Sequence, residues 1–109
     1  MVIDFSKMED TILHEFKGGK KDYVAKMYSD ESAKIMYGPL EPGASIGMHT
    51  HETSSEMIYI LSGTAEYIYD GQPETVTAGG CHYCPKGHSH TMMNNSNEDL
   101  IFFAVVPEQ

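Results

Sequence analysis

The sequence predicts an all-β fold of the sandwich or barrel type. Short runs rich in β-branched and aromatic side chains alternate with clusters of Gly, Pro, Asn, Asp and Ser at regular intervals, which is typical of such folds. No stretch keeps the apolar period of a helix, so almost no helix is expected. With 109 residues and no linker-like segment, the chain is expected to form one domain over residues 1–109.

The first half of the chain predicts five strands separated by turn signals. The expected strands are 12–16, 23–28, 33–38, 45–51 and 56–61. The stretches "FKGGKKD", "SDES", "EPGAS" and "ETSS" stand between them, and each is polar or rich in Gly and Pro. Before the first strand, Ser6 and Glu9 form a weak capping box that predicts one helical turn at most.

The second half predicts five more strands by the same reasoning. The expected strands are 64–69, 74–77, 81–84, 90–94 and 100–106. Asp70 and Gly71 form the clearest hairpin turn, and "TAGG", "CPKGHS" and "NNSNED" mark the later breaks. The last strand is also the longest apolar run of the chain.

The charge balance excludes several classes of partner. Sixteen acids against seven basic residues give a net charge of -9, which repels phosphate backbones and anionic membranes, so no nucleic acid partner is expected. All seven basic residues are lysines, which excludes a dianionic substrate clamped by arginine. No apolar run approaches the roughly 20 residues of a membrane helix, and no secretory signal is visible. No membrane contact and a cytoplasmic location are therefore expected.

The two cysteines, Cys81 and Cys84, have the C-x-x-C spacing of redox motifs. Redox pairs of this kind need a helix N-terminus, whereas this segment is expected to be a short strand that ends at Pro85. The two thiols are then expected on opposite faces of the strand. A buried structural cysteine is favoured over redox or zinc use.

A histidine pair opens the first candidate site. His49 and His51 lie two positions apart, so on an extended chain both imidazoles point to the same face. Glu56 lies five positions beyond His51 and would face the other way on an unbroken strand. The polar residues 52–55 are therefore interpreted as a loop or bulge that lets Glu56 rejoin the histidines.

A second cluster lies downstream, where His90 follows a tight turn over residues 85–87. From that position it can point into the same interior as His49 and His51. Three imidazoles and the Glu56 carboxylate would suit one divalent transition metal, Mn, Fe, Co, Ni, Cu or Zn, with coordination positions left open. Calcium and magnesium prefer more oxygen ligands.

At these positions the sequence resembles the cupins. The first cupin motif is matched over residues 43–63 by Gly43, His49, His51, Glu56 and Gly63. The second is matched over residues 79–94 by Gly79, Pro85, Gly87, His90 and Asn94. The sequence departs from the pattern at Gly80, where many cupins carry an acid outside the ligand set.

The resemblance implies a double-stranded β-helix, the jelly-roll cupin barrel of two antiparallel sheets. It also implies a metal held by the positions that match His49, His51, Glu56 and His90. A metal-dependent enzyme of dioxygenase, isomerase or cyclase type, acting on a small organic molecule, is the first functional hypothesis. The alternative is a non-catalytic module that binds a small ligand or a metal. Oxalate decarboxylation and sugar-phosphate isomerisation rank lower, because in cupins they rely on cationic clamps and Lys86 is the only cation within the motifs.

Two residues are candidates for catalysis. Glu56 can leave the metal and act as a base, and His88, in the turn loop, is expected to border the entrance and carry protons. His82 lies in an expected strand, and its side chain can face either the cavity or the outside.

Strand alternation predicts which side chains surround the site. Ile58 and Ile60 share the face of Glu56, and Met92 shares that of His90, so the interior should be mainly apolar. Candidates for the cavity wall or rim, or else for ordinary packing, are Met36, Met48, Tyr37 and Tyr83.

A homodimer is expected. Unpaired strand edges invite pairing, and residues 12–16 and 23–28 lie outside the motif core, free to add to a second subunit. Met57, Tyr59 and Leu61 would form an outward apolar stripe that a small barrel has to cover. The alternative is that the N-terminal strands fold back over this stripe.

Overall fold

Ten strands and two single-turn 3₁₀ helices make up the fold in the computed structural model, which describes all 109 residues. The elements are η1 Phe5–Lys7, β1 Thr11–His14, η2 Phe16–Gly18, β2 Asp22–Ser29, β3 Ala33–Leu40, β4 Ser45–Thr50, β5 Glu56–Ser62, β6 Thr64–Tyr69, β7 Gln72–Thr77, β8 Cys81–Cys84, β9 Ser89–Met93 and β10 Leu100–Pro107. Neither helix has the length or the apolar character needed to cross a membrane.

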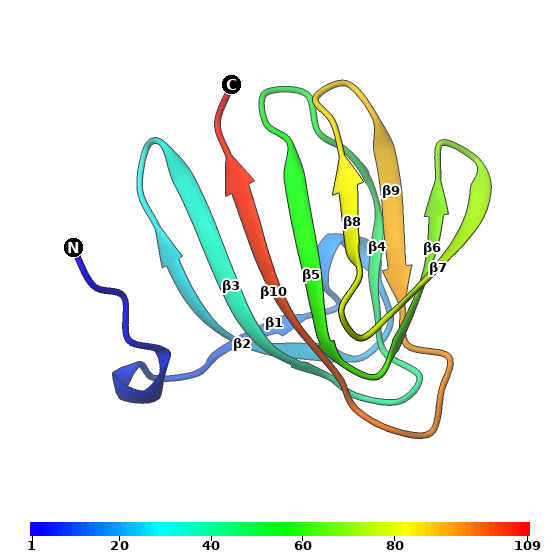
Figure 1. The fold of residues 1–109 in the computed structure, drawn as a ribbon, viewed down its shortest axis with the longest axis horizontal. Coiled ribbons are helices and arrows are strands. Elements are labelled where there is room, and N and C mark those ends of the chain that lie inside the picture. The colour runs from blue at the N-terminus through cyan, green and yellow to red at the C-terminus, as the bar shows by residue number, and fades with distance from the viewer.

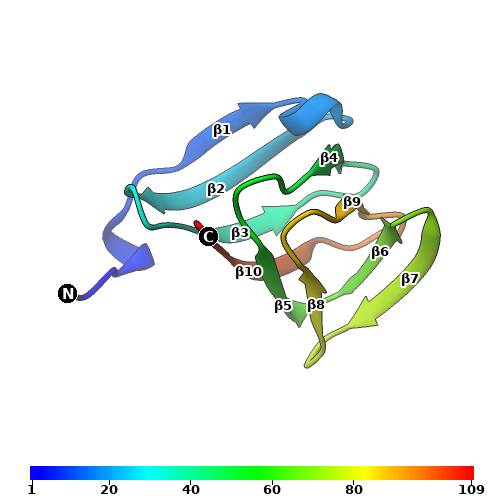
Figure 2. The same cartoon turned by 90° about the horizontal axis from the view of Figure 1, so that it is seen from above.

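The strands form two sheets that face each other (Figure 1). The six-stranded sheet has the order β1-β2-β3-β10-β5-β8 and the four-stranded sheet the order β4-β9-β6-β7, and all neighbouring strands are antiparallel. From above, β4, β9 and β6 lie opposite β3, β10 and β5 and close the barrel (Figure 2). The predicted jelly-roll barrel of two antiparallel sheets is confirmed.

All ten expected strands are present, with ends that differ from the expected ones by no more than two residues. Two of the differences arise at prolines. β3 continues through Pro39, which lies beyond Tyr37, the last β3 residue in the pairing with β2. β7 includes Pro73, which pairs with Ile68 of β6, and β7 is an edge of its sheet. A proline in these places leaves the neighbouring ladder intact.

The sequence correctly predicts the hairpin turn at Asp70 and Gly71, but not the residue that caps the first helical turn. Asp70 and Gly71 have φ angles of 47° and 81°, both positive as the expected two-residue hairpin turn requires. The single helical turn near the start is present, but its N-cap is Asp4, whose carboxylate accepts the N–H of Ser6. The expected capping box of Ser6 and Glu9 is therefore wrong, because an aspartate two residues earlier caps the turn.

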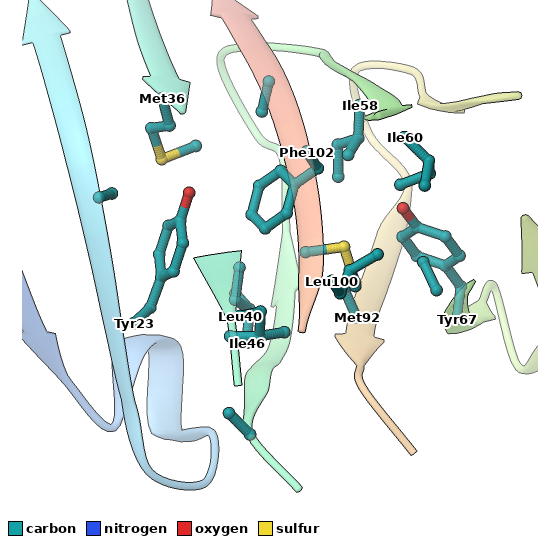
Figure 3. Packing of buried hydrophobic residues seen from close by; sticks show 14 residues of the cluster. Tyr23, Met36, Leu40, Ile46, Ile58, Ile60, Tyr67, Met92, Leu100 and Phe102 are labelled. Carbon is teal, nitrogen blue, oxygen red and sulfur yellow. The ribbon is translucent and has the colours of Figure 1, made fainter. Parts of the chain in front are cut away.

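Fourteen buried apolar side chains fill the space between the sheets (Figure 3). Ile58, Ile60 and Met92 are among them, as strand alternation predicts. The expected mainly apolar surroundings of the site are wrong on the side of the cavity described below, where only 5 of the 18 lining residues are hydrophobic. On the opposite face of β5, Tyr59 and Leu61 are each 44% exposed, whereas Met57 is half-buried, so the outward stripe is present at two of its three predicted positions.

The four candidates for the cavity wall have different places. Met36 is buried, whereas Met48 and Tyr83 are exposed on the outside of the barrel. Tyr37 stacks on the ring of Phe5 at a centroid distance of 5.2 Å. Only Met36 lines the cavity described below, because the other three side chains lie on outward positions of their strands.

The N-terminal strands stay with their own sheet. β1 pairs with β2 and β2 with β3, on the far side of β10 from β5, so these strands do not cover the stripe of Tyr59 and Leu61. Instead Phe5 of η1 packs against Phe103 at a centroid distance of 6.0 Å. Part of the outer face is covered in this way, and the stripe on β5 is not.

Candidate metal centre

The four predicted ligand residues come together inside the barrel. His49 on β4 is the direct cross-strand partner of His90 on β9. His51 lies in the loop that follows β4, and Glu56 is the first residue of β5. Residues 51–55 connect the two strands and include the predicted parity-resetting loop over residues 52–55. The donor atoms of the four residues all lie within 4.8 Å of one another, a group that could hold a metal ion.

Backbone hydrogen bonds join the two motif loops beneath this group. The N–H of His51 donates to the carbonyl of His88 at 3.0 Å, and the N–H of Gly87 donates to the carbonyl of His51 at 2.6 Å. The buried amide of Asn94 donates to the carbonyl of Leu40 at 2.8 Å. The motif positions around the ligands thus hold the loops in place.

The spacing of the imidazole nitrogens tests whether a metal fits. The Nε2 atoms of His49 and His51 are 3.1 Å apart, those of His51 and His90 3.0 Å, and those of His90 and His49 3.1 Å. Donors about 2.1 Å from one ion are about 3.0 Å apart when they are neighbours in an octahedral site and about 3.4 Å apart in a tetrahedral one. The three nitrogens therefore fit one face of a six-coordinate ion.

The carboxylate completes the set on the opposite side. Oε1 of Glu56 is 3.0 Å from Nε2 of His90 and 3.2 Å from Nε2 of His51, but 4.0 Å from Nε2 of His49. Glu56 is therefore a neighbour of two histidines and faces the third. Three neutral imidazoles with one carboxylate suit a divalent transition metal better than calcium or magnesium.

The other ring nitrogen of each candidate ligand also has a partner. Nδ1 of His49 donates to the carbonyl of Gly47 at 2.8 Å, and Nδ1 of His51 lies 2.9 Å from Oγ of Ser54. Nδ1 of His90 lies 3.0 Å from a further imidazole. A proton on Nδ1 leaves the Nε2 lone pair free to face the centre, as metal-binding histidines require.

His82 is that further imidazole, and its side chain faces the interior. It is 1% exposed, and its Nε2 approaches His90 while its Nδ1 lies 2.7 Å from Oε1 of Glu74. Burial lowers the pKa of His82, against the opposing hydrogen bond of Glu74. Sequence reasoning left the direction of His82 open and missed Glu74.

Burial and the neighbouring groups set the charges in the cluster. Burial by itself would raise the pKa of Glu56, but the hydrogen bonds and charges of His51 and His90 outweigh it and lower that pKa to about 2. Burial lowers the pKa of His49, against the opposing carbonyl of Gly47. At neutral pH an ionised carboxylate therefore faces neutral His49, the forms that bind a cation.

A cavity of about 570 Å³ adjoins the cluster. His49, His51 and Glu56 lie in its lining, with Met36 and Ile46 as apolar neighbours. Its other charged lining residues are Lys17, Lys34, Asp30, Glu31, Glu52 and Glu108. Both lysines come from outside the two motifs, which is why motif reasoning missed them.

His88 is not among the residues that line this cavity, so its expected position at the entrance is wrong. Its Nδ1 forms a short contact with Oδ2 of Asp70 and lies 3.3 Å from the hydroxyl of Tyr69, and the side chain is 44% exposed. Its link to the cluster runs through the backbone bond to His51. The catalytic role of His88 stays a prediction.

The two cysteines are free thiols on opposite faces of β8, as predicted. Cys81 is exposed and Cys84 is buried. Burial raises the pKa of Cys84 to about 11, with the charges of Glu56 and Asp70 acting in the same direction. Such a thiol stays protonated at neutral pH, which agrees with a structural rather than a redox role.

A jelly-roll barrel with three histidines and one glutamate converging inside defines the class: a small barrel protein with a group of side chains that could hold a metal ion. Residues 37–106 match the family described as the cupin domain, which is more than half of the chain. The chain belongs to this family, and the resemblance in its motifs is confirmed.

Two relatives with curated names are similar along most of the chain. An oxalate-binding protein of Thermotoga maritima is 32% identical over 112 residues, which cover 97% of this chain and 93% of the relative. The oxalate decarboxylase OxdC of Bacillus subtilis is 31% identical over 99 residues, 84% of this chain. The match spans only 26% of OxdC, about a quarter of its length.

Solved structures agree with the fold. The crystal structure of a predicted oxalate decarboxylase from Thermotoga maritima superposes with a TM-score of 0.88 at 28% identity and covers 100% of both chains. The cupin domain of Schizosaccharomyces pombe Cnp3 superposes with a TM-score of 0.77 at 11% identity, over 99% of this chain and 74% of that one. The second likeness concerns the fold alone.

Proposed function

We propose that the protein binds one divalent transition metal through His49, His51, Glu56 and His90 and uses it to bind a small oxygen-rich acid of the oxalate type. The observation that carries the proposal is the convergence of the four donors within 4.8 Å, at separations suited to ligands of one ion, in the lining of a cavity. The name and the near-complete coverage of the oxalate-binding relative support the choice of ligand.

A bound divalent ion would supply a Lewis acid that polarises a carboxylate or carbonyl oxygen of the ligand. The chain's own residues shape the approach to it. Met36 and Ile46 contribute apolar surface to the lining, while Lys17 and Lys34 offer positive charge in a lining that also contains several acids. Because these acids repel a free dianion, binding should depend on the metal.

Lys17 owes its position to a close approach between two backbones. A Cβ at Gly47 of β4 would overlap the carbonyl oxygen of Lys17 in η2, so only glycine lets η2 lie against β4. The amine of Lys17 also lies 5.5 Å from the centroid of the Phe16 ring. Gly47 therefore helps to place a cation at the cavity.

A second candidate function is catalysis on a larger small molecule, of dioxygenase, isomerase or cyclase type. The volume of the cavity favours it, because about 570 Å³ lies within the range of pockets for small organic molecules and oxalate would occupy only a part. In this hypothesis Glu56 is the candidate base, and His88 is the candidate proton carrier although it does not line the cavity. A bound metal would polarise the substrate.

The test begins with protein purified without a histidine tag, analysed for metal content and then loaded with Mn(II). Calorimetric titration with oxalate should give binding at about one ligand per chain, and none to the metal-free protein or to His51→Ala. Oxalate binding of equal strength without metal would overturn the proposal.

Turnover is measured on the same metal-loaded protein. Oxygen uptake and product analysis with oxalate, diols and phenols separate the two candidate functions. Binding of oxalate without consumption of any of these compounds supports the binding protein, and metal-dependent consumption of a diol or phenol supports the enzyme.

A further inference from the structure

A chain of hydrogen bonds runs from the metal centre to the surface through three consecutive strands. Oε1 of Glu74 on β7 lies 2.7 Å from Nδ1 of His82 on β8. Nε2 of His82 lies 3.0 Å from Nδ1 of His90 on β9. The side chain of Glu74 is 42% exposed, whereas those of His82 and His90 are 0% and 2% exposed. The outer end of the chain is therefore a carboxylate in contact with solvent.

The carboxylate fixes where each proton lies. An ionised carboxylate only accepts hydrogen bonds, so Nδ1 of His82 has to donate to Glu74. Neutral His82 then has a lone pair on Nε2, which accepts the N–H at Nδ1 of His90. His90 is left with its lone pair on Nε2, the atom that lies among the candidate ligands.

Packing holds the intermediate ring in this orientation. The ring of Tyr67 stacks on His82 at a centroid distance of 3.9 Å and an interplanar angle of 13°. The ring of His90 is nearly parallel to His82, at 5.2 Å and 17°. A buried ring between two parallel neighbours cannot turn to exchange its nitrogens without breaking this packing.

The three candidate histidine ligands differ in what supports them. His49 donates to a backbone carbonyl and His51 faces a hydroxyl, and both partners are neutral. Only His90 is supported by a chain of hydrogen bonds that ends in a carboxylate, that of Glu74. Charge-assisted hydrogen bonds are roughly twice as strong as neutral ones, and chains of them reinforce each other.

We propose that His82 and Glu74 are positioning residues that hold His90 in its metal-binding tautomer and raise the metal affinity of the centre. The proposal rests on the proposed metal site and concerns two residues that the ligand set does not include. Partners of this kind typically contribute 10- to 100-fold in metal affinity.

Four variants test it, with Mn(II) alone as the probe. His82→Phe keeps an aromatic ring against Tyr67 and removes both hydrogen bonds. His82→Gln restores an acceptor and a donor on a flexible side chain. Glu74→Gln keeps the shape and removes the charge. Glu66→Gln is the matched control. Glu66 lies in the same sheet as Glu74, and its carboxylate accepts a hydrogen bond from Thr75 but takes no part in the hydrogen-bond chain to His90.

The measurements are Mn(II) dissociation constants and the electron paramagnetic resonance spectrum of bound Mn(II). We expect His82→Phe to weaken binding by about 10- to 100-fold and to change the spectrum. His82→Gln should recover most of that loss, and Glu74→Gln should lose less than His82→Phe. Glu66→Gln should match the wild type. The melting temperatures of the metal-free variants give the purely structural effect of each change.

The outcomes are separable. If the wild type does not bind Mn(II), the proposed function fails and not this inference alone. If the wild type binds and His82→Phe binds equally tightly with the same spectrum, the positioning role is wrong. If His82→Phe does not fold, Glu74→Gln tests the proposal instead, because the Glu74 side chain is half exposed and its change should be tolerated. A Mn(II) affinity of Glu74→Gln equal to that of Glu66→Gln would overturn the proposal.

Discussion

Glu56 and His49 face each other across the ligand cluster, with Oε1 and Nε2 4.0 Å apart. Donors on opposite sides of an ion, each about 2.1 Å from it, are about 4.2 Å apart. His51 and His90 are neighbours of both. If these four residues held a six-coordinate ion, the two remaining positions would be adjacent to each other, and a ligand that offers two oxygens from one side would be favoured.

This arrangement predicts a preference for chelating acids. The Mn(II)-loaded protein should bind oxalate at least about tenfold more tightly than fumarate, because the second oxygen of a chelator binds intramolecularly. Fumarate is the matched control, since it has the same charge but its carboxylates point apart. Calorimetry gives both constants, and equal affinities would contradict two adjacent open positions.

Loss of one ligand should remove the metal and its contribution to stability. His51→Ala should retain little Mn(II) after dialysis, and added metal should no longer raise its melting temperature. At a metal concentration about 100 times the dissociation constant, binding stabilises the wild type by about 2.7 kcal/mol.

His14→Ala is the control for this variant, because His14 is 75% exposed and pairs with Asp22 away from the centre. It should keep the full metal content and the metal-induced rise in melting temperature. Full occupancy in His51→Ala would show that the ligand set is wrong.

Metal affinity should fall as the pH falls. Imidazole binds a metal only when neutral, so affinity declines below about pH 6.5, the ordinary histidine value. Burial lowers the pKa of His49, which moves its share of the decline to lower pH. Glu56, with a pKa of about 2, stays ionised throughout and contributes none of it. Mn(II) titrations between pH 7.5 and 5 test this, and a constant affinity would rule out the histidine ligands.

The exposed stripe on β5 predicts a homodimer. Tyr59 and Leu61 are each 44% exposed, and the chain's own N-terminal strands lie elsewhere. Light scattering should give about twice the chain mass of 12.1 kDa, and Tyr59→Asp should lower it towards one chain. Thr77→Asp, an exposed change in the other sheet, should leave it unchanged. A wild-type mass of one chain would reject the dimer.

Much of the fold, and the convergence of the four candidate ligands, could be predicted because the signals are local. Turn residues mark the ends of each strand. The spacing of His49 and His51 puts both side chains on one face of a strand, and the polar residues before Glu56 indicate the loop that returns Glu56 to that face. The ends of β3 and β7 were harder to predict, because proline, which has no N–H, is excluded from a strand only where a neighbouring strand would accept a hydrogen bond from that position. Whether a neighbour exists depends on sheet order, which is not local.

The surroundings of the ligands depended on contacts between distant strands. β8 has only four residues, too few for alternation alone to set the direction of the His82 side chain. The pairing of Glu56 with Cys84 puts these two side chains on one face of the sheet, and His82, two positions before Cys84, shares that face. Glu74 reaches His82 from another sheet. Lys17 and Lys34 reach the cavity from segments without a motif, so no spacing rule identifies them.

Pro73 has a consequence for the behaviour of the protein at high concentration. β7 is an edge strand of the four-stranded sheet and is exposed along most of its length. Such an edge can pair with a strand of another molecule. Proline offers no N–H to an incoming strand, and the charge of Glu74 beside it adds repulsion between copies. Both features oppose the addition of a strand at this edge, so we expect Pro73→Val to aggregate more readily than the wild type.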